Sequence, residues 1–277
     1  MKSKNSIVSS MSLGMIDSRN NAVLHSVAVP DVDNPHILPP PETTVWHYTR
    51  YEYFKKILET GMMRFTRLDK QSDKTDGNYS AENAFEYTPV TRELMNSIGF
   101  VETPQWKQLL YTNEVIRKKA YVHCWSLRKK ESAWMWNSFL GAETRSIAIC
   151  STIKRLQIAL QGHPVELQRI IYYPPGVPRP DWSYTAPFSA KDRVKYRDER
   201  ELRLISVTEP EQSDESEFRL FKIDKNALVA KIVVHPLSAR EFQKEVQHDL
   251  NRYGISVHVA RSSLGACDLQ AVAKRLP

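Results

Sequence analysis

The stretch that decides how this chain is interpreted is Tyr196-Arg-Asp-Glu199-Arg-Glu201-Leu-Arg203-Leu-Ile205. Glu199 and Glu201 are two residues apart, so in an extended strand both carboxylates point to the same face. The leucines of the stretch then point to the opposite face, which can be buried, and Arg203 can keep the carboxylates ionised. This pattern predicts a strand that presents two carboxylates to a cleft, one as a base or charge stabiliser and the other as its orienter.

The same residues also fit a second interpretation. Glu199 and Arg203 are four residues apart, a spacing that brings opposite charges together on the surface of a helix. An amphipathic helix or strand with a solvated charged face would need no further function. The choice between the two interpretations depends on which residues the rest of the chain brings near this stretch.

Length and composition are those of an ordinary folded protein. The chain has 277 residues, 41% of them hydrophobic and 26% charged, which is enough for one large or two small domains with a proper core. The formal net charge of +7 favours an anionic partner such as nucleic acid, a nucleotide or an acidic protein surface. The three cysteines form no disulfide framework and no zinc pattern. Because no apolar run is long enough for a membrane span and no signal peptide opens the chain, we expect a cytoplasmic protein without membrane contacts.

We expect a loose N-terminal arm over residues 1–42, followed by one α+β domain over residues 43–277. The arm contains Ser, Asn and Pro and has no sustained periodicity. In the domain, helices are inserted between strands rather than strictly alternating with them, so we expect a mixed, mainly antiparallel sheet. Strands are predicted at 43–49, 62–68, 120–127, 145–152, 166–173, 196–205, 218–223, 229–234 and 255–260. Helices are predicted at 51–60, at 81–117 with a break near 99–104, and at 132–140, 153–160 and 239–253.

Polar and aromatic side chains gather at the end of the first predicted strand. Tyr48 and Thr49 directly follow His47, and a helix is predicted to begin two residues later. An imidazole and a hydroxyl at a strand end can bind ribose hydroxyls or a phosphate, and an aromatic ring can stack on a flat heterocycle. A lone histidine on a strand is also compatible with a purely structural role.

Other motifs with known chemistry are weak or missing. The loop that holds Asp69, Asp73 and Asp76 has the wrong spacing for a calcium site, and we expect no bound metal. Neither His123 nor Cys124 has the partner that a thiol protease needs. The sequence contains no Walker loop and no GxGxxG motif.

Six short motifs, in order, resemble a large uncharacterised bacterial domain family. That family opens with a "YHYT…ILxSG" unit and continues with the motifs "D-x-x-E-G", "CFS", "LMW" and "EKEWR". Here Asp76 stands where the family has Glu, and Leu202 where it has Trp. The resemblance covers residues 44–264 and carries no settled activity. The matching stretches are Trp46-His-Tyr-Thr49, Ile57-Leu-Glu-Thr-Gly61, Asp73-Lys-Thr-Asp-Gly77, His123-Cys-Trp-Ser126, Trp134-Met-Trp136 and Glu199-Arg-Glu-Leu-Arg203.

The layout of that family is similar to the ADP-ribosyltransferase fold, which implies NAD as the substrate. The resemblance implies that Glu201 is the catalytic carboxylate and that Glu199 is its helper. A carboxylate beside the ribose would stabilise the oxocarbenium-like cation that forms as the nicotinamide–ribose bond breaks. His47 would contact a ribose, and Thr66 or Tyr48 would lie near the nicotinamide. The full set expected to bind NAD is His47, Tyr48, Thr49, Thr66 and Arg67.

The resemblance therefore predicts transfer of ADP-ribose from NAD to a nucleic acid or protein acceptor, in a bacterial toxin or phage-defence setting. Two alternatives stay open: a non-catalytic module that binds a nucleotide or nucleic acid in the same cleft, and a metal-free hydrolase that uses water as the acceptor. The geometry discriminates between them. An enzyme requires Glu199 and Glu201 to share one cleft with His47 and Tyr48, whereas carboxylates that point into solvent far from His47 would exclude it.

Overall fold

The structure is a computed structural model that describes residues 37–71, 73, 76, 115, 117–173, 190–192, 196–208 and 216–273. Residues 1–36 of the predicted arm and most of the predicted helix over 81–117 lie outside these ranges. None of the described helices combines the length and the apolar character that crossing a membrane requires. The strands are β1 (Thr44–Arg50), β2 (Met62–Arg67), β3 (Ala120–Leu127), β4 (Ser146–Thr152), β5 (Glu166–Arg169), β6 (Ile171–Tyr173), β7 (Ala190–Asp192), β8 (Glu201–Val207), β9 (Phe218–Lys222), β10 (Lys231–Val234) and β11 (Val259–Arg261). The helices are α1 (Tyr51–Thr60), α5 (Ala133–Phe139), α6 (Ile153–Ala159), α8 (Lys225–Leu228), α9 (Arg240–Arg252) and α10 (Ala266–Ala273), with two 3-10 turns, η2 (Leu68–Lys70) and η5 (Arg197–Glu199).

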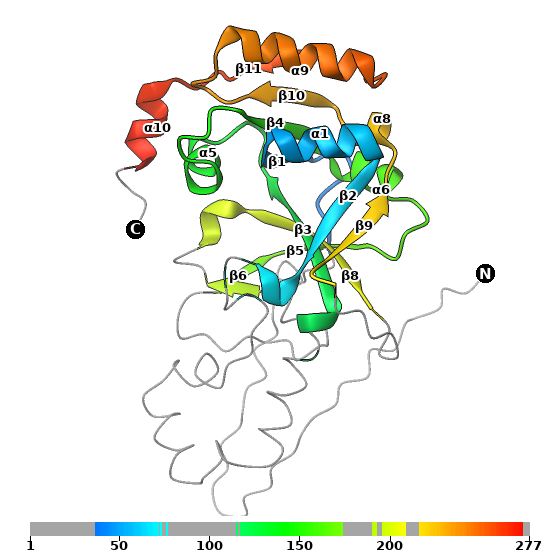
Figure 1. Cartoon of the computed structure of the whole chain (residues 1–277). Helices are drawn as coiled ribbons and strands as arrows, with labels where there is room; N and C mark the ends of the chain where they lie inside the picture. Colours follow the sequence, from blue (N-terminus) through cyan, green and yellow to red (C-terminus); the bar gives the residue numbers. More distant parts are fainter. Residues whose placement is uncertain are drawn as a thin grey trace, which may run out of the picture.

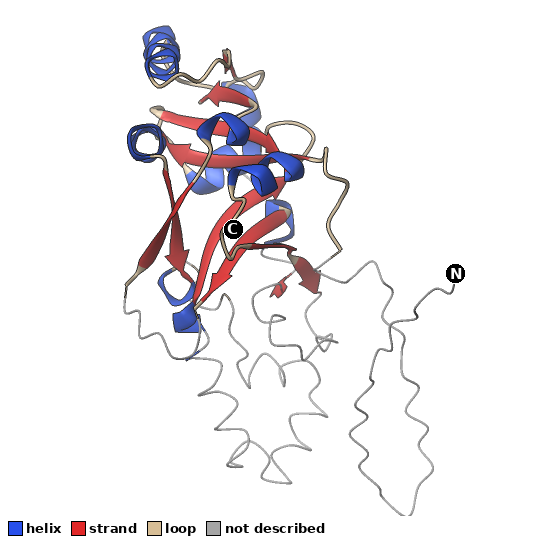
Figure 2. Ribbon diagram, turned by 90° about the vertical axis from the view of Figure 1, so that its right-hand side faces the viewer, coloured by secondary structure: helices blue, strands red, loops and turns tan. Residues whose placement is uncertain are grey.

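A mixed, mostly antiparallel sheet forms the centre of the described structure, as predicted (Figure 1). Its main path runs β11-β10-β4-β1-β3-β2-β9, with β8 paired to β3 and β5 paired to β8. Only the pairing of β10 with β11 is parallel within this sheet. A separate pair, β6 and β7, is also parallel. In Figure 2 the upper strands run across the view, while others descend from them in two separate groups, so the sheet divides as it descends.

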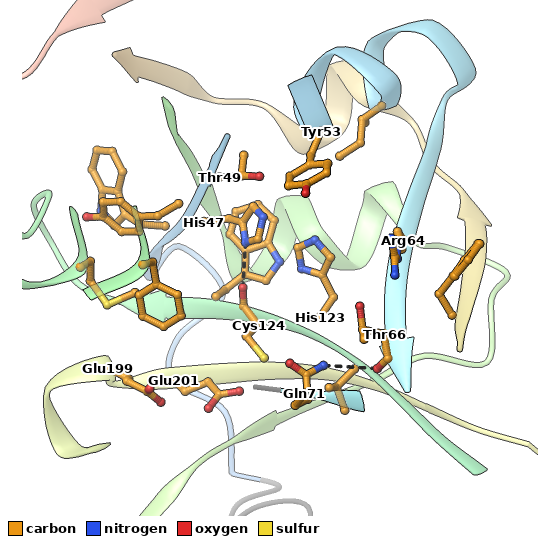
Figure 3. Close-up of a pocket in the computed structure, with 18 of the residues that line it drawn as sticks. His47, Thr49, Tyr53, Arg64, Thr66, Gln71, His123, Cys124, Glu199 and Glu201 are labelled. Atoms are coloured by element: carbon orange, nitrogen blue, oxygen red, sulfur yellow. Dashed lines mark hydrogen bonds between the residues drawn. The ribbon is translucent and has the colours of Figure 1, made fainter. Parts of the chain in front are cut away.

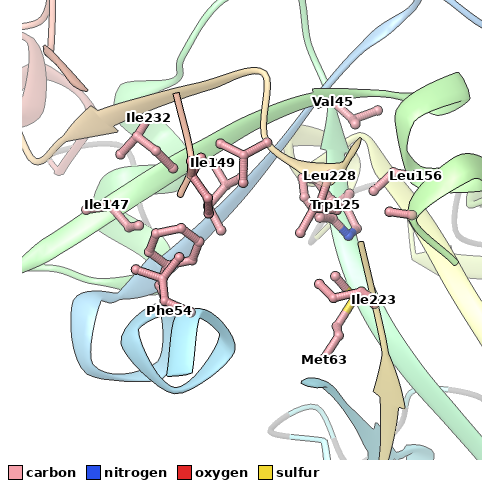
Figure 4. Packing of buried hydrophobic residues seen from close by; sticks show 14 of the residues in the cluster. Val45, Phe54, Met63, Trp125, Ile147, Ile149, Leu156, Ile223, Leu228 and Ile232 are labelled. Carbon is pink, nitrogen blue, oxygen red and sulfur yellow. The ribbon is translucent and has the colours of Figure 1, made fainter. Parts of the chain in front are cut away.

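Alternating residues of β1 place different side chains on the two faces of the sheet. Val45 joins the large core, which also holds Phe54 (Figure 4). Phe54 and Leu58 of α1 are fully buried there. Trp46 and Tyr48 join a second buried cluster. That cluster includes residues of α5 and α10, which lie side by side in Figure 1. Both faces of the sheet are therefore covered around β1, which holds the strand and its polar residues in fixed positions.

The stretch with the paired carboxylates does not form one strand or one helix. Residues Arg197–Glu199 form η5, Arg200 adopts a left-handed backbone with φ 47°, and β8 begins only at Glu201. The predicted alternation of Glu199 and Glu201 on one strand face is therefore wrong. The exposed charged helix is wrong as well, because β8 is buried over nearly its whole length.

Several other element boundaries differ from the prediction. The predicted strand at 166–173 divides into β5 and β6, which belong to different sheets. The break falls at Ile170, whose backbone N–H donates to the carbonyl oxygen of Glu201. The predicted strand at 255–260 shortens to β11, and neither β7 nor the helices α8 and α10 were expected. These elements are short, so they carry little hydrophobic periodicity of their own.

Candidate functional site

The site lies where the sheet forks. Along one edge of β3, β8 pairs over Ala120–Ser126. The other edge is shared: β2 pairs with it at Tyr121 and Val122, and β1 pairs with it at Ser126 and Leu127. Neither β1 nor β2 pairs with the residues between, 123–125, and α1 bridges the two diverging strands. A pocket of about 750 Å³ opens at this fork, a size typical of small-molecule sites.

His47 lies inside the fork (Figure 3). Its Nδ1 donates a hydrogen bond to the backbone carbonyl oxygen of Cys124, at 2.9 Å. Burial lowers the pKa of His47 to about 4, so the ring is neutral near pH 7, although the bond to Cys124 opposes that shift. With the proton on Nδ1, Nε2 is a hydrogen-bond acceptor. A ligand hydroxyl group is the natural partner for such an acceptor.

A second histidine lies against the first. The ring centroids of His47 and His123 are 4.3 Å apart, and those of His47 and Trp125 are 5.4 Å apart. Burial, and then the neighbouring His47, lower the pKa of His123 well below its ordinary value. The Nδ1 of His123 is buried and has no hydrogen-bond partner among the residues that the structure describes. The centre of the pocket is therefore a neutral, largely aromatic surface.

One end of the pocket is a network of charges that we call the acid cluster: Asp76, Glu199, Glu201, Lys191 and Arg203. Arg203 is fully buried and binds two carboxylates at once, with Nε 2.7 Å from Glu201 Oε1 and Nη2 2.8 Å from Asp76 Oδ2. Lys191 Nζ lies 2.8 Å from Glu201 Oε2 and 2.8 Å from Glu199 Oε2. Bidentate arginine contacts of this kind fix geometry as well as charge.

The environment separates the pKa values of the two glutamates. Burial raises the pKa of Glu199 above its ordinary value, and the charge of Lys191 only partly opposes this shift. Burial acts on Glu201 in the same direction, but the charges of Arg203 and Lys191 outweigh it and lower the pKa of Glu201 well below its usual range. Two carboxylates whose environments separate their pKa values are typical of acid–base sites, with one group held ionised and the other able to exchange a proton.

The formal charge of the acid cluster is negative. Its three carboxylates face two cations, which leaves one negative charge in excess when all five groups are ionised. Lys191 and Asp76 are nine-tenths or more buried, so water screens this charge weakly. The acid cluster can therefore stabilise positive charge that develops in the pocket.

Most of the predicted site residues line this one pocket. His47 and Tyr48 line it together with both glutamates, the arrangement that the enzymatic interpretation expects. The Tyr48 hydroxyl oxygen, however, accepts a hydrogen bond from the backbone N–H of Ser132, and the Tyr48 ring packs edge-on against Trp136. Its phenol is thus held by the protein itself. The predicted residues that line the pocket are His47, Tyr48, Thr49, Thr66, Glu199 and Glu201.

Arg67 lies outside the pocket wall, although it follows Thr66 directly. Its Nε lies 2.7 Å from Asp69 Oδ1, so the guanidinium forms an ion pair within the same turn. Successive side chains of β2 point to opposite faces of the sheet, which separates Arg67 from Thr66. This geometry does not support the expected contact between Arg67 and NAD.

Sequence reasoning missed one important residue of this pocket and noted two others for different reasons. Lys191 lies on β7, which has only three residues and no periodicity to mark it. His123 is noted in the sequence as a possible partner for a thiol nucleophile and as part of a family motif. Asp76 is noted in the sequence as part of a loop unsuited to calcium and as a substitution within a motif, yet it binds Arg203 across 127 positions of sequence. Within the described residues, no group of three or more His, Cys, Asp or Glu could hold a metal ion.

Comparison with solved structures gives weak similarity to DarT of Thermus sp. 2.9. In its complex with NAD+, that protein has 14% sequence identity to this chain and a TM-score of 0.35. The match covers 80% of this chain and 96% of that chain. In its complex with ADP-ribosylated ssDNA, the sequence identity is 12% and the TM-score 0.37, and the match covers 80% of this chain and 95% of that chain. No protein-family model and no curated protein matches the chain. These TM-scores are too low to establish a shared fold, so the function below rests on the pocket itself.

Proposed function

We propose that the pocket binds NAD and transfers its ADP-ribose group to a macromolecule. The observation that carries this proposal is that one pocket brings together Glu199, Glu201 and His47, with Glu201 fixed by Arg203 and Lys191 and with His47 bonded to the described part of the protein through Nδ1 alone. Glu201 is a permanent anion, Glu199 can accept a proton, and His47 offers an acceptor for a ribose hydroxyl group. These are the groups that cleavage of a glycosidic bond to a cationic base requires.

The proposed reaction needs no group beyond NAD and the acceptor. The bond between ribose C1′ and the nicotinamide nitrogen breaks, and its electron pair goes to the nicotinamide ring, which becomes neutral. The ribose becomes an oxocarbenium-like cation, which the negative charge of the acid cluster stabilises. An acceptor nucleophile attacks C1′ and gives its proton to Glu199. Water as the acceptor would give hydrolysis of NAD by the same steps.

We propose a nucleic acid as the preferred acceptor. The formal net charge of +7 attracts polyanions, and this attraction weakens as salt rises. A protein acceptor would use the same chemistry at C1′ with a different nucleophile. A toxin or phage-defence setting remains a prediction from the family resemblance.

The proposal is tested by titrating NAD into the protein and following nicotinamide release in the same samples. We expect NAD to bind at about 1 mM or below, and nicotinamide to be released by the wild-type protein. Glu201→Gln keeps the shape of the side chain but removes its charge, and should slow release by at least about 100-fold. Glu241→Gln, on the exposed first turn of α9, is the matched control. No binding of NAD at that concentration would reject the proposal.

A non-catalytic nucleotide-binding site is the second candidate, and one observation favours it. Glu201 is only 3% exposed, and Arg203 and Lys191 hold both of its carboxylate oxygens. A carboxylate held in this way can be purely structural. Binding of NAD without nicotinamide release, in the presence of single-stranded and double-stranded nucleic acid, would favour this candidate.

A further inference from the structure

The wall of the pocket formed by α1, β2 and β9 has a different chemistry from the acid cluster. It carries two cations, Lys56 and Arg64, and neither forms an ion pair with another described residue. The nearby carboxylate of Glu217 instead pairs with Lys70, at 2.7 Å. Figure 3 shows Arg64 and Tyr53 on the far side of the pocket from Glu199 and Glu201.

Exposed aromatic rings accompany these cations. Tyr53 is 49% exposed and Phe218 39% exposed, although both are large apolar residues that line the pocket. The Arg64 guanidinium lies 4.4 Å from the centroid of the Phe218 ring, and the Lys56 ammonium lies 5.9 Å from that of Tyr53. We call these four residues the cationic wall. Exposed aromatic rings beside cations are the means by which proteins stack bases and hold phosphates.

The sheet register explains why Arg64 and Phe218 of the cationic wall face the pocket. Arg64 pairs with Leu220, and Thr66 with Phe218, between β2 and β9. All four of these residues line the pocket, whereas the alternate residues Met63 and Phe65 are buried in the core. The backbone alternation therefore fixes the direction of the Arg64 side chain.

We infer that the cationic wall binds the adenosine diphosphate half of NAD, an inference that rests on the proposed function. The nicotinamide ring of NAD is a cation and its diphosphate is a dianion. With the nicotinamide at the acid cluster and the diphosphate at Arg64 and Lys56, the cationic ring lies beside negative charge and the dianionic diphosphate lies beside positive charge. The reverse orientation would place the dianion against the excess negative charge of the acid cluster, which is electrostatically unfavourable.

Two parts of the cationic wall take different parts of the nucleotide. Arg64 presents a planar set of donors that suits phosphate oxygens, and Lys56 adds a flexible point charge. Tyr53 and Phe218 present ring faces on which the adenine can stack. His47, between the acid cluster and the cationic wall in Figure 3, is placed to accept a ribose hydroxyl group.

The test compares ligands that contain one half of NAD each. ADP carries the adenosine and the phosphates, whereas nicotinamide riboside carries the cationic ring and no phosphate. Calorimetric titration of each ligand is repeated with Arg64→Gln and with Glu201→Gln. Arg64→Gln should weaken ADP binding at least about tenfold and leave nicotinamide riboside unchanged, and Glu201→Gln should do the reverse. Arg240→Gln, on the exposed start of α9, is the control, and thermal unfolding confirms that each variant is folded.

The outcomes separate this inference from the proposed function. Binding of ADP that depends on Arg64, without any cleavage of NAD, would reject the transferase and support the inference. Failure of ADP to bind at about 1 mM would overturn the inference, as would an equal loss of both ligands in Arg64→Gln. A single-stranded oligonucleotide is titrated in parallel. If Arg64→Gln weakens only the oligonucleotide, the cationic wall is a nucleic-acid surface and the inference is wrong.

Discussion

The His47 side chain makes a hydrogen bond to Cys124 of the kind that a neighbouring strand would otherwise make. Its Nδ1 donates to the backbone carbonyl oxygen of Cys124, at a position where neither β1 nor β2 pairs with β3. A buried carbonyl oxygen without a donor costs free energy, so the imidazole satisfies a group that the fork leaves open. The same ring then presents its other nitrogen as an acceptor. His47 thus has a structural bond on one side and a free acceptor for a ligand on the other.

The first prediction concerns the pH dependence of stability. Burial lowers the pKa of His47 from 6.5 to about 4, so the unfolded chain binds a proton that the folded protein does not. The neutral ring contributes about 3 kcal/mol to the free energy of unfolding. This contribution is fully present above pH 6.5 and is lost as the pH falls toward 4. Urea denaturation from pH 7 to 4 should give a flatter profile for His47→Gln than for wild type. The exposed His258→Gln should follow wild type, and equal slopes for all three proteins would refute this explanation.

The second prediction concerns the stability of the acid cluster. Arg203→Met removes a group that contacts Glu201 and Asp76 with two hydrogen bonds each. Two buried carboxylates then remain without that partner, and the free energy of unfolding should fall by about 3–5 kcal/mol. Arg240→Met, on an exposed helix start, should change it by less than about 0.5 kcal/mol. Similar midpoints for the two variants in urea would show that the network contributes little.

The third prediction separates the roles of the two glutamates. The pKa of Glu199 lies above its ordinary 4.5, so its base form is lost as the pH falls through that raised value. The rate of nicotinamide release should fall on the acid side for this reason. Glu199→Gln should lower the rate about 100-fold at neutral pH and remove the acid limb of the profile. Glu201→Gln should lower the rate at every pH but keep the fall on the acid side. If the rate of Glu199→Gln still falls on the acid side, a group other than Glu199 causes that fall.

The fourth prediction tests the turn that joins α1 to β2. Gly61 ends α1 with φ 69°, and its N–H donates to the carbonyl oxygen of Ile57. An added Cβ at Gly61 would meet no atom within 4 Å, so Gly61→Ala costs only backbone strain, about 1 kcal/mol. Gly265→Ala is the matched control, because Gly265 does not have a positive φ. Equal thermal midpoints for Gly61→Ala and wild type would contradict the assigned strain.

Local sequence was enough to predict the elements whose pattern lies within a few residues. The strand predicted at 43–49 and the helix predicted at 51–60 follow from short-range periodicity, and they match β1 and α1 to within one residue. The family resemblance implied that Glu201 and His47 belong to one site, and both line the pocket. The local pattern of the paired glutamates was wrong. It required Glu199 on the strand of Glu201, whereas the left-handed Arg200 separates η5 from β8.

Only the tertiary structure decided how the charges of the pocket are arranged. Arg203 meets Asp76 across 127 positions, and Lys191 reaches both glutamates from a three-residue strand. Strand pairing across such separations depends on the register of the whole sheet, which no local pattern records. The chain by itself determined which residues have the chemistry, because side-chain type and short-range spacing are local properties. The fork of β1 and β2 along β3 determined which of them meet, because a pocket exists only once the distant strands have paired.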